Sequence, residues 1–212
     1  MLGLLRRINL KNNNVDPIFK RNNVILIHCV TREGGAGNKY STGKSIYERI
    51  NNVINKNFEL STSTIKHGDC IYQGDRNNLF GPVGIILKNS RITFASQNDA
   101  GTWVIEKGKR LKETDNIPSE VDIEQAITMR NDNSYNELCA IDYKPIGFIL
   151  CKDDNPYLIQ NITSEVDFFN NTKDYNLPFY FLYQGSLKKV VFDNTTNNFT
   201  FLSNISFDDI YN

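Results

Sequence analysis

The alternation of apolar and polar positions predicts a domain built mainly of β-strands. Short apolar runs rich in β-branched and aromatic residues, bounded by Gly, Pro, Asn or Asp, are typical of strands. Such runs lie at residues 23–30, 58–65, 83–87, 91–96, 99–108, 137–141, 145–150, 178–185, 187–193 and 199–203. We expect about eight of them to form strands. The runs at 83–87 and 91–96 suggest a hairpin with its turn at 88–90.

One segment has a clear helical period. Within 41–58, Ile46, Ile50, Val53 and Ile54 fall on one helical face, and Ser41 or Thr42 is a plausible N-cap. Residues 119–130 are either a second helix or the lead-in to a strand. Strands and helices do not alternate regularly, as a doubly wound parallel sheet would require. The fold class expected is therefore α+β and sheet-rich, with one or two helices.

Length and charge narrow the classes of function. The 212 residues suit one domain over residues 24–212, preceded by a polar, basic segment, 1–23, that we expect to be a flexible arm. Lys plus Arg equals Asp plus Glu, which argues against nucleic-acid binding through a general basic field. The four cysteines are far apart and contain no CxxC pair, so we expect buried thiols and no metal site.

Neither a membrane anchor nor a secretory leader is apparent. No apolar run is long enough to span a bilayer, and at the start of the chain the arginines follow the short apolar segment instead of preceding it. We therefore expect a cytoplasmic protein or an effector delivered into a host cell. The oligomeric state is left open.

The segment from 24 to 45 resembles a phosphate-binding loop, because an apolar strand leads through a glycine-rich turn to Gly43-Lys44-Ser45. A P-loop needs four residues between its first glycine and Gly-Lys-Ser, so that successive backbone N–H groups surround the phosphates. Here five residues separate Gly37 from Gly43, and Asn38 occupies the required position. Asp193, at the end of an apolar run, is the candidate magnesium ligand.

The same strand also carries candidate chemistry in its side chains. Alternation places His28, Val30 and Arg32 on one face. An arginine at the exit of an apolar strand supplies a planar fork for a diphosphate or a carboxylate. Further along, Ser61 and Ser63 alternate with Thr62, and their hydroxyls are able to bind a ribose or a neighbouring charged side chain. Glu137 then follows a polar loop and begins an apolar strand.

An arginine, a Ser-Thr-Ser strand and a glutamate in this order resemble the Arg–Ser–Glu class of mono-ADP-ribosyltransferase toxins and effectors, which includes the cholera-like enterotoxins. The resemblance covers residues 24–150. It implies a split β-sandwich of two small sheets with NAD bound between them. It also implies that Arg32 holds NAD, that Ser61, Thr62 and Ser63 order the pocket, and that Glu137 is catalytic.

Two departures from the family pattern concern the acidic residues and the target. The position two residues before Glu137, where the family usually has Glu or Gln, holds Tyr135, so the modified side chain stays open. Residues Asn133 and Tyr135 would belong to the target-recognising loop. A lesser candidate for the glutamate motif is the cluster of Glu120, Asp122 and Glu124.

The resemblance implies cleavage of the nicotinamide–ribose bond of NAD and transfer of ADP-ribose to a protein acceptor. The family's His–Tyr–Glu class offers a second role for His28, as an NAD-binding residue. Tyr72 or Phe80 is a candidate for stacking on the nicotinamide. Two alternatives remain at this point: a β-rich binding module without enzymatic activity, and a P-loop-like phosphotransferase that uses Gly43-Lys44-Ser45.

Overall fold

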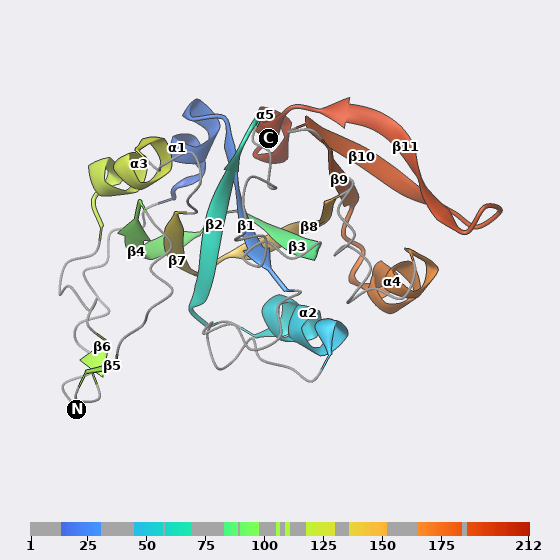
Figure 1. The fold of residues 1–212 in the computed structure, drawn as a ribbon, viewed down its shortest axis with the longest axis horizontal. Helices are drawn as coiled ribbons and strands as arrows, with labels where there is room; N and C mark the ends of the chain where they lie inside the picture. The colour runs from blue at the N-terminus through green and yellow to red at the C-terminus, as the bar shows by residue number, and fades with distance from the viewer. Residues whose placement is uncertain are drawn as a thin grey trace.

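The apolar run after Asn23 forms β1 (Val24–Cys29), which lies inside a nine-stranded sheet of the computed structural model (Figure 1). All but the last residue of β1 are buried, because both faces of the sheet are covered along this strand. The structure describes residues 14–30, 45–56, 58–68, 83–88, 90–97, 105–106, 109–110, 118–129, 136–151, 165–183 and 186–212.

The remaining strands mostly follow the predicted runs. They are β2 (Leu60–Lys66), β3 (Val83–Lys88), β4 (Arg91–Ser96), β5 (Ile105–Glu106), β6 (Lys109–Arg110), β7 (Glu137–Ile141), β8 (Lys144–Cys151), β9 (Phe179–Tyr183), β10 (Ser186–Asp193) and β11 (Asn198–Ile205). The helices are α1 (Asp16–Arg21), α2 (Ile46–Asn55), α3 (Glu120–Thr128), α4 (Glu165–Thr172), the 3₁₀ turn η3 (Lys173–Tyr175) and α5 (Phe207–Ile210).

The strands form one large mixed sheet and one small one. The large sheet has the order β11-β10-β9-β8-β3-β1-β2-β7-β4, and β5 pairs with β6 separately. Strands β8 and β9 are parallel, whereas the other neighbouring pairs are antiparallel. The α+β class is therefore confirmed, but the expected pair of small sheets is corrected to a nine-stranded sheet with a two-stranded one.

Strand β2 changes partner along its length. Its second half, Ser63 to Lys66, pairs with β1, and its first half, Leu60 to Thr62, pairs with β7. In Figure 1 this long strand stands between β7 and β4 on one side and β1, β3 and β8 on the other. The switch of partner occurs within Ser61–Ser63.

The predicted hairpin of 83–87 and 91–96 is wrong. Strand β3 pairs with β1 and β8, whereas β4 pairs with β7 at an edge of the sheet. Burial explains the separation. The continuous apolar run of β3 suits a central strand covered on both faces, and the mixed pattern of β4 suits an edge.

Two apolar cores lie on opposite faces of the sheet. Along β1, Val24 and Leu26 belong to the larger core, and Ile25 and Ile27 belong to the smaller one. Helices α1 to α4 contribute side chains to the larger core, and α5 contributes Phe207 and Ile210 to the smaller one. Five α-helices thus occur within the described residues, where the sequence pattern indicated one or two.

Part of the expected N-terminal arm is structured. The sequence pattern predicts a flexible arm over residues 1–23, but Asp16–Arg21 form α1, which packs on β1 and buries Ile18 and Phe19. Pro17 at the start of the helix and the buried side chains of Val15, Ile18 and Phe19 explain why so short a helix forms here. Residues 1–13 lie outside the described part.

Candidate functional site

Strands β2 and β7 bring together Ser61 and Glu137, which are 76 positions apart in the sequence. The Ser61 hydroxyl donates a hydrogen bond to Glu137 Oε1 at 2.9 Å. The β2–β7 register pairs Ser61 with Cys139 and Thr62 with Leu138. Glu137 therefore lies diagonally across from Ser61, a spacing that long side chains bridge.

Ser61, Ser63 and Glu137 share one face of the sheet. Their neighbours Leu60 and Leu138, with opposite side-chain direction, pack in the larger core, so these three residues face the side of the smaller core. Both serines are half-buried, but the Glu137 side chain is 3% exposed. The hydrogen bond from Ser61 satisfies one oxygen of this buried carboxyl group, because burying a polar group without a partner is costly.

Asn136, the residue directly before Glu137, also contacts this part of β2 through its side-chain amide. Its Oδ1 accepts hydrogen bonds from Ser63 Oγ and from the backbone N–H of Thr64, both at 2.8 Å. Its Nδ2 donates to Thr64 Oγ1 at 2.6 Å and to the Ala126 carbonyl at 3.1 Å. The three residues Ser61, Ser63 and Glu137 are thereby connected to helix α3.

His28 lies on the other face of the sheet. It pairs with Ile85, a residue of the larger core, and is buried there. Its Nδ1 is 2.7 Å from the Ser61 carbonyl, an acceptor, so Nδ1 carries the proton and donates. Burial lowers the pKa of His28 below its ordinary value, and the bond to Ser61 only partly offsets this. The imidazole is thus neutral, and its hydrogen bond to Ser61 joins β1 to β2 at the place where the two strands separate.

Thr62 also faces the larger core. Its hydroxyl donates to the Leu138 carbonyl of β7 at 2.5 Å, and the side chain is buried. This contact fastens β2 to β7. The side chains of Ser61, Ser63 and Glu137 therefore lie together on one face of the sheet. Those of His28 and Thr62 lie on the opposite face, where their hydrogen bonds hold β2 in place.

Several of the predicted site residues lie outside the described residues. These are Arg32, Asn133, Tyr135, Tyr72 and Phe80, together with Gly43 and Lys44. Strand β1 ends at Cys29, and Val30 is the last residue described before Arg32. The nearest described neighbour of Arg32 is Val30, whose carbonyl accepts a hydrogen bond from Arg49 Nη1 at 3.2 Å.

The P-loop interpretation has little support in the described part of the chain. Ser45, and not Ser41 or Thr42, is the N-cap of α2, and its hydroxyl accepts from the Glu48 N–H. Asp193 is hydrogen-bonded to the Thr195 N–H in the β10–β11 turn. Strands β9, β8 and β3 separate β10 from β1, which amounts to roughly 19 Å at about 4.8 Å per strand. The run that would carry the magnesium ligand is therefore not a neighbour of the strand that leads into the glycine-rich segment.

Two residues of the acidic cluster at 120–124 form hydrogen bonds with other residues of the fold. Asp122 forms a capping box with Ser119, and hydrogen bonds from Ser119 lower the pKa of its carboxyl group. Glu124 receives two hydrogen bonds from Arg21, which lower its pKa to about 2. Because these residues are on helix α3, Glu120 and Glu124 share one face but Asp122 does not, so the three do not line one face as they would on a strand.

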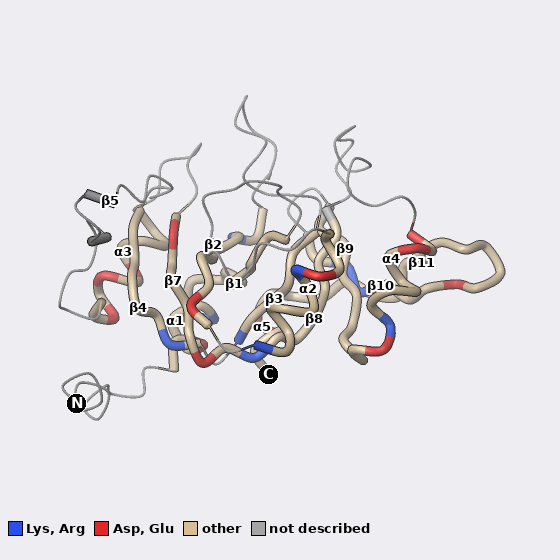
Figure 2. The backbone as a smooth tube through the Cα atoms, turned by 90° about the horizontal axis from the view of Figure 1, so that it is seen from below, with Lys and Arg blue, Asp and Glu red and all other residues tan. Residues whose placement is uncertain are grey.

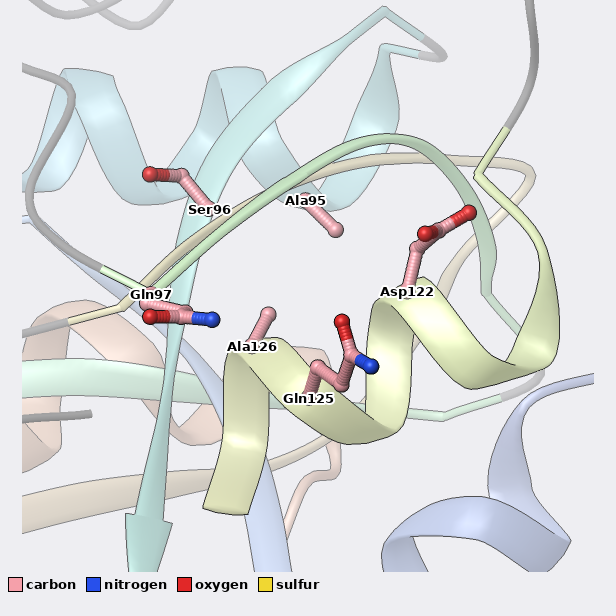
Figure 3. A pocket seen from close by; sticks show the side chains of 6 residues that line it. All are labelled: Ala95, Ser96, Gln97, Asp122, Gln125 and Ala126. Carbon is pink, nitrogen blue, oxygen red and sulfur yellow. The ribbon is translucent and has the colours of Figure 1, made fainter. Parts of the chain in front are cut away.

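A recess of about 320 Å³ lies between α3 and the edge strand β4 (Figure 3). Its lining residues are Ala95, Ser96, Gln97, Asp122, Gln125 and Ala126. Ala126 belongs to the larger core, so the recess opens on the helix-covered face of the sheet. Ser96 pairs with Glu137 in the β4–β7 ladder. The recess therefore adjoins the candidate site along the β4–β7 ladder.

The charge distribution points to no single partner class. Basic and acidic residues are interspersed along the described chain (Figure 2). Among the described helices, none is long and apolar enough to cross a membrane. The described His, Cys, Asp and Glu residues form no group of three that is suited to a metal ion.

Sequence reasoning did not identify Asn136 and Arg49. Arg49 had a usable signal, since it lies on the apolar face of α2 with Ile46, Ile50 and Val53 and is 8% exposed. A charged residue on the buried face of an amphipathic helix needs internal partners. Asn136 had a weaker signal, because an asparagine at the end of a polar loop is ordinary.

Neither a protein-family model nor a curated protein sequence matches the chain.

Proposed function

We propose that the protein is a mono-ADP-ribosyltransferase that takes NAD as substrate and transfers ADP-ribose to a protein acceptor. The observation that carries the proposal is the hydrogen bond from Ser61 to the buried Glu137. The Ser-Thr-Ser segment and the glutamate, chosen from the sequence, are in direct contact through their side chains. A binding module has no catalytic need for this part-buried contact between a serine and a glutamate.

The sheet gives secondary support. The family resemblance implies that NAD binds between two small sheets. In this chain β2 leaves β1 and joins β7 within Ser61–Ser63, at the position of the candidate site. The divergence at these residues favours a site there over one elsewhere along the strand.

The proposed reaction uses the buried carboxylate next to the nicotinamide ribose of NAD. The bond between the ribose C1′ and the nicotinamide nitrogen breaks, its electron pair leaves with nicotinamide, and C1′ becomes oxocarbenium-like, as in glycoside hydrolysis. The Glu137 carboxylate would stabilise this positive charge and bind the ribose 2′-hydroxyl. Ser61 fixes one carboxylate oxygen, which reduces the reorganisation needed during the reaction. The acceptor forms the new bond to C1′ and loses its proton to water.

The test is nicotinamide release from NAD, measured with and without cell lysate, for the wild type and Glu137→Gln. The substitution keeps the shape but removes the charge, so we expect the rate to fall at least about a hundredfold. Labelled NAD would in addition mark the acceptor protein in the lysate.

Two control variants separate the roles of the acidic residues. Glu165→Gln alters another partly buried glutamate, which accepts from the Phe199 N–H, and should leave the rate unchanged. Glu124→Gln tests the acidic cluster of α3. Loss of activity in Glu124→Gln but not in Glu137→Gln would move the catalytic role to that cluster. No nicotinamide release in any lysate, with no NAD binding by calorimetry, would overturn the proposal in favour of a binding module.

A further inference from the structure

The side-chain amide of Asn136 is 2% exposed and makes four hydrogen bonds, two as acceptor and two as donor. Four is the full capacity of a primary amide. Its orientation is fixed by its partners. The Thr64 N–H is purely a donor and must face Oδ1, and the Ala126 carbonyl is purely an acceptor and must face Nδ2. A flipped amide would break both contacts.

This amide replaces a backbone partner at the end of the β2–β7 ladder. The register that pairs Thr62 with Leu138 would next bring Thr64 opposite Asn136. There the Asn136 side chain, and not its backbone, takes up the Thr64 N–H. The backbone of residue 136 can therefore turn away from β2 while Glu137, one residue later, stays in the sheet.

The same amide binds the last turn of helix α3. The carbonyls of the last turn of a helix have no partner within the helix. Asn136 Nδ2 satisfies one of them, on Ala126, and so fixes the end of α3 relative to the start of β7. Residues 130–135 connect these two fixed points.

We propose that Asn136 is a positioning residue for Glu137 and Ser63. Its side chain holds the start of β7 against both β2 and α3, and its Oδ1 accepts the hydrogen bond from the Ser63 hydroxyl. Because the Ser63 hydroxyl donates its hydrogen bond to Asn136, its oxygen lone pairs are left to act as acceptors. The site therefore takes a ligand group that donates a hydrogen bond, such as a ribose hydroxyl or a carboxamide N–H. This inference rests on the proposed function.

The experiment compares Asn136→Ala, which removes all four bonds, with Asn136→Asp, which has the same shape and keeps the oxygen facing Thr64 and Ser63. We expect kcat for nicotinamide release to fall at least about tenfold in Asn136→Ala, by less in Asn136→Asp, and KM for NAD to change less than about threefold in both. The matched control is Thr172→Val. It removes a fully buried hydroxyl-to-carbonyl bond, to Phe168 in α4, without changing side-chain shape.

A second measurement does not depend on NAD turnover. The titration midpoint of the Glu137 carboxyl carbon, followed by NMR, should move in Asn136→Ala and stay at the wild-type value in Thr172→Val. An inactive wild type would remove the proposed function, yet a moved midpoint would still support the positioning role. Equal kcat in Asn136→Ala and Thr172→Val, or an unmoved midpoint, would overturn it.

Discussion

Arg49 Nη1 donates a hydrogen bond to the backbone carbonyl of Val30, so a buried cation on α2 holds the exit of β1. The N–H···O distance between nitrogen and oxygen is 3.2 Å. Val30 is two positions before Arg32, the residue that the family resemblance assigns to NAD binding. The contact therefore links the packing of α2 to the place where the chain leaves the sheet.

We expect Arg49→Met to lower the free energy of unfolding by about 1.5–3 kcal/mol, because the change leaves a buried carbonyl without its charged donor. Urea denaturation measures this loss directly. If the proposed function holds, KM for NAD should also rise, since Arg32 would be less well positioned. Arg21→Met is the control, because Arg21 is exposed and pairs with Glu124 at the surface. Equal losses in the two variants would contradict the role of Arg49.

The buried His28 predicts a dependence of stability on pH. Its pKa is lowered in the folded protein from an ordinary value near 6.5, so below that value the unfolded chain binds more protons than the folded one. Its contribution to stability is complete above about pH 6.5 and is lost as the pH falls from there toward the folded pKa. Urea midpoints measured between about pH 7.5 and about pH 5 should decline accordingly.

His28→Asn isolates this effect, because the asparagine amide can donate to the Ser61 carbonyl as Nδ1 does but does not titrate. Its stability should change less over the same pH range than that of the wild type. The control is His67→Asn, on an exposed residue at the end of β2, which should retain the full decline. A wild-type slope in His28→Asn would show that other groups cause the pH dependence.

The local sequence pattern was sufficient to predict most of the strands, but not which strands pair with one another. The runs at 187–193 and 199–203 lie in β10 and β11, which pair directly, as adjacent strands often do. The segments in β3 and β4 look equally suited to a hairpin, yet three strands separate them. Which strands pair is decided by burial across the whole sheet, which short windows of sequence do not contain.

The short helices were missed for a related reason. Helix α5 has four residues, too few for a periodic signal, and forms because Phe207 and Ile210 complete the smaller core while Ser206 caps its start. Within the candidate site, the pairing of Ser61 with Glu137 was foreseeable from the resemblance. The Asn136 contacts were not, because they depend on where α3 ends relative to β2.

The hydrogen bond from Ser61 predicts a specific loss of rate. Ser61→Ala removes the donor to the buried Glu137 Oε1, and a hydrogen bond to a charged group contributes about 1.5–3 kcal/mol. We expect the rate of nicotinamide release to fall about tenfold to about a hundredfold. Thr200→Val is the control, since it removes a strand hydroxyl that donates to Val191 at the far edge of the sheet. A fall of the same size in Thr200→Val would assign the loss to the fold and not to the site.

Gly147 on β8 allows a test of the packing between β8 and β9 that does not depend on any function. A methyl group at this position would lie 2.6 Å from Tyr180 Cε2 and 3.2 Å from the Pro178 carbonyl oxygen. Contacts that short require the buried Tyr180 ring to move, so Gly147→Ala should cost about 1–3 kcal/mol of unfolding free energy.

Tyr180→Leu removes the obstructing ring edge and leaves a partly empty space. The double variant should therefore be more stable than the sum of the two single losses predicts, by at least about 0.5 kcal/mol. Strictly additive losses in urea denaturation would mean that the tyrosine ring does not limit the space at Gly147, and that the carbonyl of Pro178 sets the close approach of these two parallel strands.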